Sequence, residues 1–217
     1  MIRIEDFTAG ISATALASRR QDAPWELVAQ LAEVVTHLLR ELPTQDYVIE
    51  ADVAVHRTAL IEPGAVLKGP LIVGPHCFVA AGAYLRGGGW LGERCIIGPG
   101  AELKTSVLLS GTKLAHFNFV GDSVLGANVN LEAGSIICNY RNERDDKQVR
   151  VRIGDRLHDT GCEKFGALLG DGVRLGANAV LAPGAIIEAG FVVGRGEVFD
   201  AEAQHQAALS AAAGGGR

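Results

Sequence analysis

Residues 49–109 read IEADVAVHRTALIEPGAVLKGPLIVGPHCFVAAGAYLRGGGWLGERCIIGPGAELKTSVLL, with an aliphatic residue at every sixth position. The series has eleven members: Ile49, Val55, Ile61, Leu67, Val73, Val79, Leu85, Leu91, Ile97, Leu103 and Leu109. Four positions further on the side chain is usually small, as at Cys77, Ala83, Cys95 and Ala101. A fixed short period of this kind is the signature of a repeat architecture.

A six-residue period, or hexad, predicts short strands joined by tight turns rich in Gly, Pro and Asn. Three hexads close one triangular coil, and successive coils stack about 4.8 Å apart. Aliphatic anchors and small corner residues then point inward, and no coil buries a face alone. We therefore predict an all-β parallel β-helix of about seven coils over residues 47–198. The later anchors are Phe119, Leu125, Leu131, Ile137, Leu169, Leu175, Leu181, Ile187 and Val193.

Two interruptions break the hexad rhythm. The gap of ten between Leu109 and Phe119 predicts a four-residue insertion around KLAHFN, residues 113–118. A longer excursion occupies residues 138–168, and its QVRVRIG stretch alternates apolar with basic side chains, which indicates one strand of an extruded hairpin. Loops that leave a repeat scaffold at its corners commonly carry function.

Both ends of the chain are predicted to be helical. Within residues 1–46, apolar side chains recur at helical spacing over residues 24–42, with Pro24 as a first-turn residue and Pro43 as a stop. This predicts one amphipathic helix that packs against, or caps, the first coil. Residues 199–217 are predicted to form a helical tail with a short C-terminal helix and a glycine-rich end.

Composition excludes several functional classes. The chain has a net charge of −5 with mixed signs, so we expect neither nucleic acid nor a membrane surface as partner. No apolar run approaches the roughly 18 residues that span a bilayer, and the first residues lack the layout of a signal peptide. The four cysteines show no metal-ligand spacing, and Cys77 and Cys95, three hexads apart, are expected to stack reduced in the core. A cytoplasmic protein is the simplest interpretation.

The period also aligns three cations. Lys68, Arg86 and Lys104 each follow an anchor and are separated by three hexads, or one full coil, so they should form a column on one outer surface. Like charges about 4.8 Å apart repel one another unless an anion relieves them. We expect a phosphate site here. The alternative is a solvated basic stripe.

The stretch GTKLAHFNFVGDSVLGANVNLEAGSIICNY, residues 111–140, resembles the acetyltransferase domain of bacterial N-acetylglucosamine-1-phosphate uridylyltransferase/glucosamine-1-phosphate acetyltransferase. It is more similar still to the hexapeptide-repeat domain of sugar-1-phosphate nucleotidylyltransferases. The resemblance implies a left-handed β-helix, acetyl-CoA as acyl donor with no metal, and a homotrimer with active sites between subunits. Because residues 47–198 are taken up by the predicted β-helix, we do not expect the nucleotidyltransferase activity of that family from these 217 residues.

The resemblance also assigns roles to residues. His116 matches the general base. Asn139 and Tyr140 match the pair beside the sugar and acetyl groups, with Asn139 predicted as catalytic and Tyr140 as substrate-binding. Asn130 matches a substrate-binding asparagine. Arg86 and Lys104 match sugar-phosphate ligands, with Lys68 continuing their column. Residues matched to the acetyl-CoA side are Ala133, Ala177 and Arg195. The alternatives are a solvated loop histidine for His116 and a turn residue for Asn130.

Some positions depart from the family pattern. Phe119 stands where the family has tyrosine, and Ala177 replaces a serine on the acetyl-CoA side; Lys147 is a loose match to a further lysine. Two hypotheses therefore remain: an acetyl-CoA-dependent N-acetyltransferase acting on an amino-sugar phosphate or nucleotide amino sugar, or a non-catalytic trimeric module that binds a sugar phosphate or partners a separate nucleotidyltransferase. A zinc carbonic anhydrase is disfavoured, because three histidines at metal-ligand spacing are not found.

Overall fold

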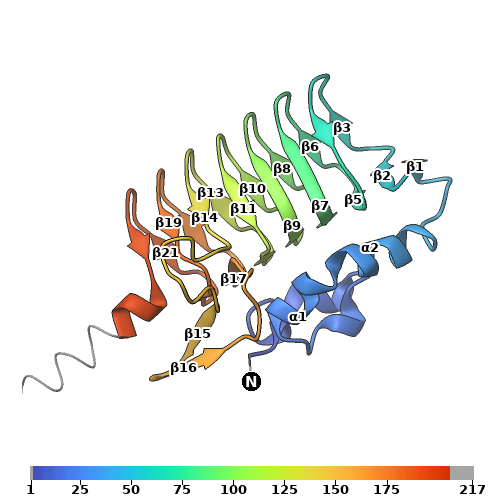
Figure 1. Ribbon diagram of the computed structural model, residues 1–217. Helices are drawn as coiled ribbons and strands as arrows, with labels where there is room; N and C mark the ends of the chain where they lie inside the picture. The colour runs from blue at the N-terminus through green and yellow to red at the C-terminus, as the bar shows by residue number, and fades with distance from the viewer. Residues whose placement is uncertain (1, 206–217) are drawn as a thin grey trace, which may run out of the picture.

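The computed structural model describes residues 2–205, which form a parallel β-solenoid with helices along one side (Figure 1). Every coil contributes one short strand to each of three rows, and strands within a row pair in parallel. The first row contains β2 (Val53–His56), β5 (Leu71–Val73), the ends of β7 (Tyr84–Leu91) and β9 (Glu102–Leu108), β12 (Val124–Leu125), β17 (Ala167–Leu169) and β20 (Ala185–Ile187).

The other two rows have the same number of strands. The second row contains β3 (Leu60–Ile61), β6 (Phe78–Val79), β8 (Ile96–Ile97), β10 (Lys113–Leu114), β13 (Asn130–Leu131), β18 (Arg174–Leu175) and β21 (Val192–Val193). The third row contains β4 (Val66–Leu67), the starts of β7 and β9, β11 (Phe119–Gly121), β14 (Ile136–Ile137), β19 (Val180–Leu181) and β22 (Val198–Phe199). The predicted parallel solenoid of hexapeptide repeats is thereby confirmed.

The core is a stack of aliphatic anchors and small residues inside the coils. Leu85, Leu103 and Ile97 are among the fully buried side chains, and Cys77 and Cys95 lie between them as free thiols. A few inward positions are polar and find partners: the Asn118 side-chain amide donates to Glu132 O at 2.7 Å and to Ser135 Oγ at 2.9 Å. Buried polar groups therefore tie neighbouring coils together.

The strand register shows that two coils are each one residue short of three hexads. Leu85 pairs with Leu103, a step of three full hexads, but Leu103 pairs with Val120, and Val120 with Ile137, and both of these steps are shorter by one. The predicted four-residue insertion at residues 113–118 is therefore wrong. In both coils the missing residue is in the segment that leads from the third-row strand to the first-row strand, residues 103–108 and 120–125, which we call the shortened sides. Leu108 and Val120, not Leu109 and Phe119, are therefore the core anchors.

The shortened sides turn tightly between the third and first rows. Thr105 and Asp122 adopt the left-handed conformation there, each with φ +46°. The Ser106 hydroxyl accepts the Ser123 N–H at 3.1 Å, and the Ser123 hydroxyl accepts the Ala167 N–H at 3.0 Å, so side chains satisfy main-chain groups that the turn leaves without strand partners.

The N-terminal segment covers the outer side of the first row, below the coils in Figure 1. Its elements are η1 (Ile4–Asp6), η2 (Ala9–Ala13), η3 (Ala17–Arg19), α1 (Pro24–Ala29) and α2 (Leu31–Leu39). The single helix predicted over residues 24–42 is wrong, because the backbone breaks at Gln30 and α2 ends at Leu39. Leu27 and Leu31 pack in one apolar cluster with Trp90 and Val107, so the segment flanks several coils.

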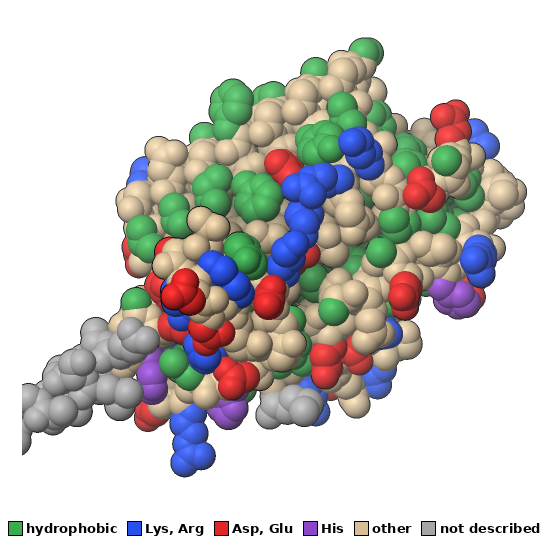
Figure 2. Space-filling model, viewed as in Figure 1, with side chains coloured by type: hydrophobic (Ala, Val, Ile, Leu, Met, Phe, Trp, Pro, Cys, Tyr) green, Lys and Arg blue, Asp and Glu red, His purple; other side chains and the backbone are tan. Residues whose placement is uncertain are grey.

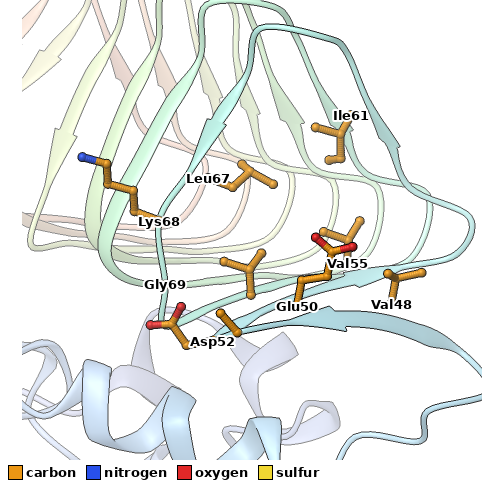
Figure 3. Close-up of a pocket in the computed structure, with 10 residues that line it drawn as sticks. Val48, Glu50, Asp52, Val55, Ile61, Leu67, Lys68 and Gly69 are labelled. Carbon is orange, nitrogen blue, oxygen red and sulfur yellow. The ribbon is translucent and has the colours of Figure 1, made fainter.

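The first coil is crossed by an additional strand. β1 (Tyr47–Glu50) pairs antiparallel with β2, so Ile49 lies outside the core and its prediction as an anchor is wrong. Beside this hairpin the solenoid interior is open, leaving a cavity of about 820 Å³ lined by aliphatic side chains such as Ile61 and Leu67 (Figure 3). The cavity lies at the end of the stack and holds none of the motif residues apart from Lys68 at its rim.

The excursion over residues 138–168 carries the predicted hairpin, formed by β15 (Arg150–Ile153) and β16 (Arg156–Asp159). Residues 201–205 are helical, as expected for the tail; the remaining predicted tail, residues 206–217, lies outside the described residues. Within residues 2–205 no helix has the length and apolarity required to cross a bilayer.

Truncating a core anchor should destabilise the fold. Leu103→Ala is expected to lower the free energy of unfolding by about 2–5 kcal/mol, because the stacked coils cannot close the resulting cavity. Chemical denaturation followed by circular dichroism measures this. Val198→Ala, at a side chain that is 64% exposed, is the control and should change stability by about 0.5 kcal/mol or less. Equal effects of the two substitutions would contradict the assignment of the core.

Candidate active site

One corner of the solenoid aligns four of the predicted site residues. His116, Ala133, Ala177 and Arg195 occupy the same place, between the second and third rows, in four successive coils. The His116 side chain is exposed, and it is followed by Phe117, also exposed, whose ring lies over Gly100. Main-chain hydrogen bonds of 2.9 Å connect the corners: Gly134 N–H to His116 O, Asn178 N–H to Ala133 O and Gly196 N–H to Ala177 O.

The outer surface of the third row extends from this corner to the next. The strand register places Tyr84, Glu102 and Phe119 side by side on consecutive coils of this surface. The Phe119 ring leans over Gly121, where an added Cβ would lie 2.9 Å from the ring. This surface therefore joins the His116 corner to the basic column.

The basic column follows from the strand register. Lys68 lies beside Arg86, and Arg86 lies beside Lys104, at the corner between the third and first rows. Figure 2 shows Lys and Arg side chains running as a band across the coils on this face. The next position in the column is Gly121, because the coil after Lys104 is one of the two shortened coils.

Carboxylates accompany the column. Glu102 lies 2.7 Å from an Arg86 guanidinium nitrogen, and Asp122 lies 2.6 Å from Lys104 Nζ. Lys68 has its ammonium 5.1 Å from the centre of the Tyr84 ring, a cation–π distance. Three cations and two carboxylates leave one net positive charge on this part of the surface, less than the sequence alone indicated.

Asn139 and Tyr140 begin the excursion directly beside this cluster. The Asn139 amide donates to Asp122 Oδ2 and packs over Gly121, which has no side chain to exclude it. Tyr140 has Lys147 Nζ 5.3 Å from its ring centre. Lys147 donates to the carbonyl oxygens of Arg141, Asn142 and Arg144, so it is held within the excursion.

Asn130 lies elsewhere. It belongs to the second row, facing a hollow of about 170 Å³ that is also lined by Glu132, Arg174 and Arg195. Glu132 accepts hydrogen bonds from Ala177 N–H at 2.9 Å and from Arg195 at 3.0 Å. These two contacts hold the pKa of the Glu132 carboxyl below its usual value. Within one chain, Asn130 and Lys104 are therefore on different sides of the solenoid.

Three further residues of this surface were not predicted from the sequence: Tyr84, Glu102 and Asp122. Tyr84 and Glu102 are separated by three hexads and immediately precede anchors, so the period contained a signal for both. Asp122 was not recognisable in this way, because its position beside Lys104 depends on the shortened coil.

A buried arginine fixes the excursion to the end of the solenoid. The Arg141 side chain is only 4% exposed and lies 2.7 Å from Asp200 and 3.4 Å from Glu202, while Arg144 lies 2.7 Å from Glu202. We call these ion pairs the Arg141 clamp. Asn139 and Tyr140 immediately precede Arg141, so the clamp restrains the start of the excursion beside Asp122.

The rows of short strands and their stacked aliphatic anchors define a hexapeptide-repeat β-solenoid. Within that class, the chain is 41% identical over 88 residues to the bifunctional sugar-1-phosphate nucleotidylyltransferase/acetyltransferase of Sulfurisphaera tokodaii, covering 41% of this chain and 21% of the relative. It is 30% identical over 168 residues to the bifunctional protein GlmU of Methanococcus aeolicus, covering 74% of this chain and 39% of the relative. The resemblance predicted from the motifs is thus confirmed.

The matched regions span about a fifth to two fifths of these relatives. No protein-family model matches the chain. Among solved structures, a hexapeptide transferase family protein from Anaplasma phagocytophilum aligns with a TM-score of 0.38 and 20% identity, covering 67% of this chain and 72% of that one.

The Arg141 clamp should make the free energy of unfolding depend on pH in the acidic range. Partial burial alone would raise the pKa of Asp200, but the hydrogen bond and charge of Arg141 bring that pKa below its usual value. Such a carboxylate stabilises the fold above the unfolded-state pKa of about 3.9, and this contribution disappears as pH falls through the folded-state value. The free energy of unfolding should therefore decrease more steeply between about pH 5 and pH 3 in the wild type than in Asp200→Asn.

Asp155→Asn serves as the matched control, since the Asp155 side chain is fully exposed and lies 3.8 Å from its nearest arginine. Its pH profile, measured by urea denaturation, should parallel that of the wild type. A profile for Asp200→Asn as steep as that of Asp155→Asn would show that the clamp contributes nothing in this pH range.

Proposed function

We propose that this chain transfers an acetyl group from acetyl-CoA to the amine of an amino-sugar phosphate or a nucleotide amino sugar. The observation that carries the proposal is the arrangement on the third-row surface. His116 lies at one edge, and the Lys104, Asp122 and Asn139 cluster lies at the other. The similarity to a nucleotidylyltransferase/acetyltransferase supports acyl transfer to a sugar.

In the proposed reaction, the substrate nitrogen attacks the thioester carbonyl carbon and the C–N bond forms. His116 accepts the proton that the amine loses, a role suited to imidazole because its pKa lies near working pH. The C–S bond then breaks, and the departing CoA thiolate takes up a proton. Main-chain N–H groups stabilise the negative charge that develops on the carbonyl oxygen.

Acetyl-CoA would lie along the corner column. Ala133 and Ala177 project only methyl groups there, so an extended thiol arm has room beside the main chain of successive coils. From His116 to Arg195 the column rises three coils, roughly 14 Å at the usual strand spacing. Arg195 at its far end is a cation suited to a CoA phosphate, and it also forms an ion pair with Glu132.

A homotrimer would complete the site. Asn130 and Lys104 lie on different sides of one chain, so a substrate that contacts both takes them from two copies. The exposed Phe117 beside His116 is suited to packing against a neighbouring copy.

The second candidate is a non-catalytic module that binds a sugar phosphate. It is favoured by the pairing of Arg86 with Glu102 and of Lys104 with Asp122, which reduces the positive charge available to an anion. The replacement of a tyrosine and a serine of the family pattern by Phe119 and Ala177 also favours the non-catalytic module. Turnover distinguishes the two candidates.

Replacing His116 tests catalysis. His116→Ala should lower kcat for thiol release from acetyl-CoA by about 100-fold or more, because it removes the general base of the proposed reaction. The assay is run across amino-sugar phosphates and nucleotide amino sugars. His158→Ala, an exposed histidine on the hairpin, is the control and should retain the wild-type rate. Equal rates for wild type and His116→Ala would favour the binding module.

Replacing Lys104 tests the phosphate site. Lys104→Ala should raise the dissociation constant for glucosamine-1-phosphate by about tenfold or more, since a charge-assisted contact to phosphate is lost. Titration calorimetry measures the constant, and Lys113→Ala, an exposed lysine on the second row, is the control. An unchanged dissociation constant in Lys104→Ala would refute the assignment of the basic column.

A further inference from the structure

Asp122 connects two of the predicted site residues to each other. Its side chain is 7% exposed, and its carboxylate accepts both from Lys104 Nζ, at 2.6 and 2.8 Å, and from the Asn139 amide. The two contacted side chains belong to different coils: Lys104 is the phosphate ligand of the proposed reaction, and Asn139 is one of its predicted catalytic residues. One buried carboxylate thus fixes both.

The main chain of Asp122 also hydrogen-bonds to Lys104 and to the end of the excursion. Its N–H donates to Lys104 O at 2.8 Å, and its C=O accepts from Gly166 N–H at 2.8 Å. Gly166 lies at the end of the excursion, and Asn139 lies at its start, so Asp122 contacts both ends of that long loop. Its φ of +46° is a conformation in which aspartate and asparagine are tolerated better than most side chains.

The carboxylate also opposes the function of the cation that it holds. A phosphate beside Lys104 meets the negative charge of Asp122 at the same ammonium group. The charge of Asp122 therefore weakens ground-state binding of the phosphate, while its geometry holds Lys104 and Asn139 in place. A residue with these two effects should raise both kcat and KM, so that its removal lowers both.

We infer that Asp122 is a positioning residue, which orients Lys104 and Asn139 for the acyl acceptor at the expense of phosphate affinity. The inference rests on the proposed function and adds to it a specificity-determining carboxylate. Asp122→Asn keeps the size of the side chain and an oxygen that accepts from Asn139, but it removes the charge that holds Lys104.

The experiment compares Asp122→Asn with wild type for thiol release from acetyl-CoA and for binding of glucosamine-1-phosphate alone. We expect kcat to fall about tenfold or more and the dissociation constant of the phosphosugar to fall about threefold, because Lys104 becomes an unpaired cation. Lower kcat together with tighter binding supports the inference. Unchanged kcat, or unchanged or weaker binding in a folded variant, overturns it.

Asp171→Asn is the matched control. Asp171 also joins separate segments, accepting from Ala127 N–H at 2.7 Å and Ala9 N–H at 3.3 Å, but it touches no site residue. It should lower the melting temperature without changing kcat or phosphosugar binding. If Asp122→Asn changed only the melting temperature, as this control does, Asp122 would be structural and the inference would be wrong.

Lys104, whose side chain is only 17% exposed, loses its partner in Asp122→Asn, and a second pair of variants decides the case in which this variant does not fold. Lys104→Met is compared with the double variant Lys104→Met/Asp122→Ala, which removes both charges together and also removes the acceptor of the Asn139 amide. A further fall in kcat in the double variant supports positioning of Asn139 by Asp122, and equal kcat overturns it. If wild type shows no turnover, the proposed function fails separately, and binding decides: tighter binding in Asp122→Asn, or in the double variant relative to Lys104→Met, supports the inference, and its absence overturns it.

Discussion

Main-chain hydrogen bonding between successive coils is the constraint on which the rest of the structure depends. Most strands here are two or three residues long and cannot exist alone, so each coil is held by the coils above and below it. In-register pairing stacks the aliphatic anchors inside and, at the same time, aligns the residues that follow them outside. The columns at both edges of the third row are consequences of that pairing: His116, Ala133, Ala177 and Arg195 at one edge, and Lys68, Arg86 and Lys104 at the other.

The two shortened coils give this solenoid its particular site. The loss of one residue from each of the sides 103–108 and 120–125 forces a tight turn, and Asp122 lies in the second of these turns with a left-handed backbone. A coil of three full hexads would bring a different residue beside Lys104. The excursion leaves from the same corner one coil later, which places Asn139 next to Asp122, and the Arg141 clamp ties the loop to Asp200 and Glu202.

The hexad period predicted the solenoid, the anchors from Ile61 to Leu103 and the alignment of the basic column, because inward aliphatic positions are the strongest signal in such a chain. The period was misleading at Leu109, and the reason is physical. Leu108 is buried inside the coil, whereas Leu109 is buried from outside in the cluster that contains the N-terminal segment, so both are aliphatic and the shortened side left no trace in the pattern. The ion pairs of Arg86 and Lys104 were equally hidden, since they depend on which carboxylates the true register places within reach.

Disulfide trapping tests the register most directly. Lys113 on β10 pairs with Asn130 on β13, a step one short of three hexads, and both side chains face outward. In a background with the four native cysteines replaced by alanine, Lys113→Cys/Asn130→Cys should form a disulfide readily, because paired positions on adjacent strands lie about 4.8 Å apart. Lys113→Cys/Leu131→Cys, the pair that a step of three full hexads would place side by side, should cross-link far more slowly, because Leu131 is buried inside the coil. Preferential cross-linking of the second pair would contradict the shortened coil, and with it the placement of Asp122 beside Lys104.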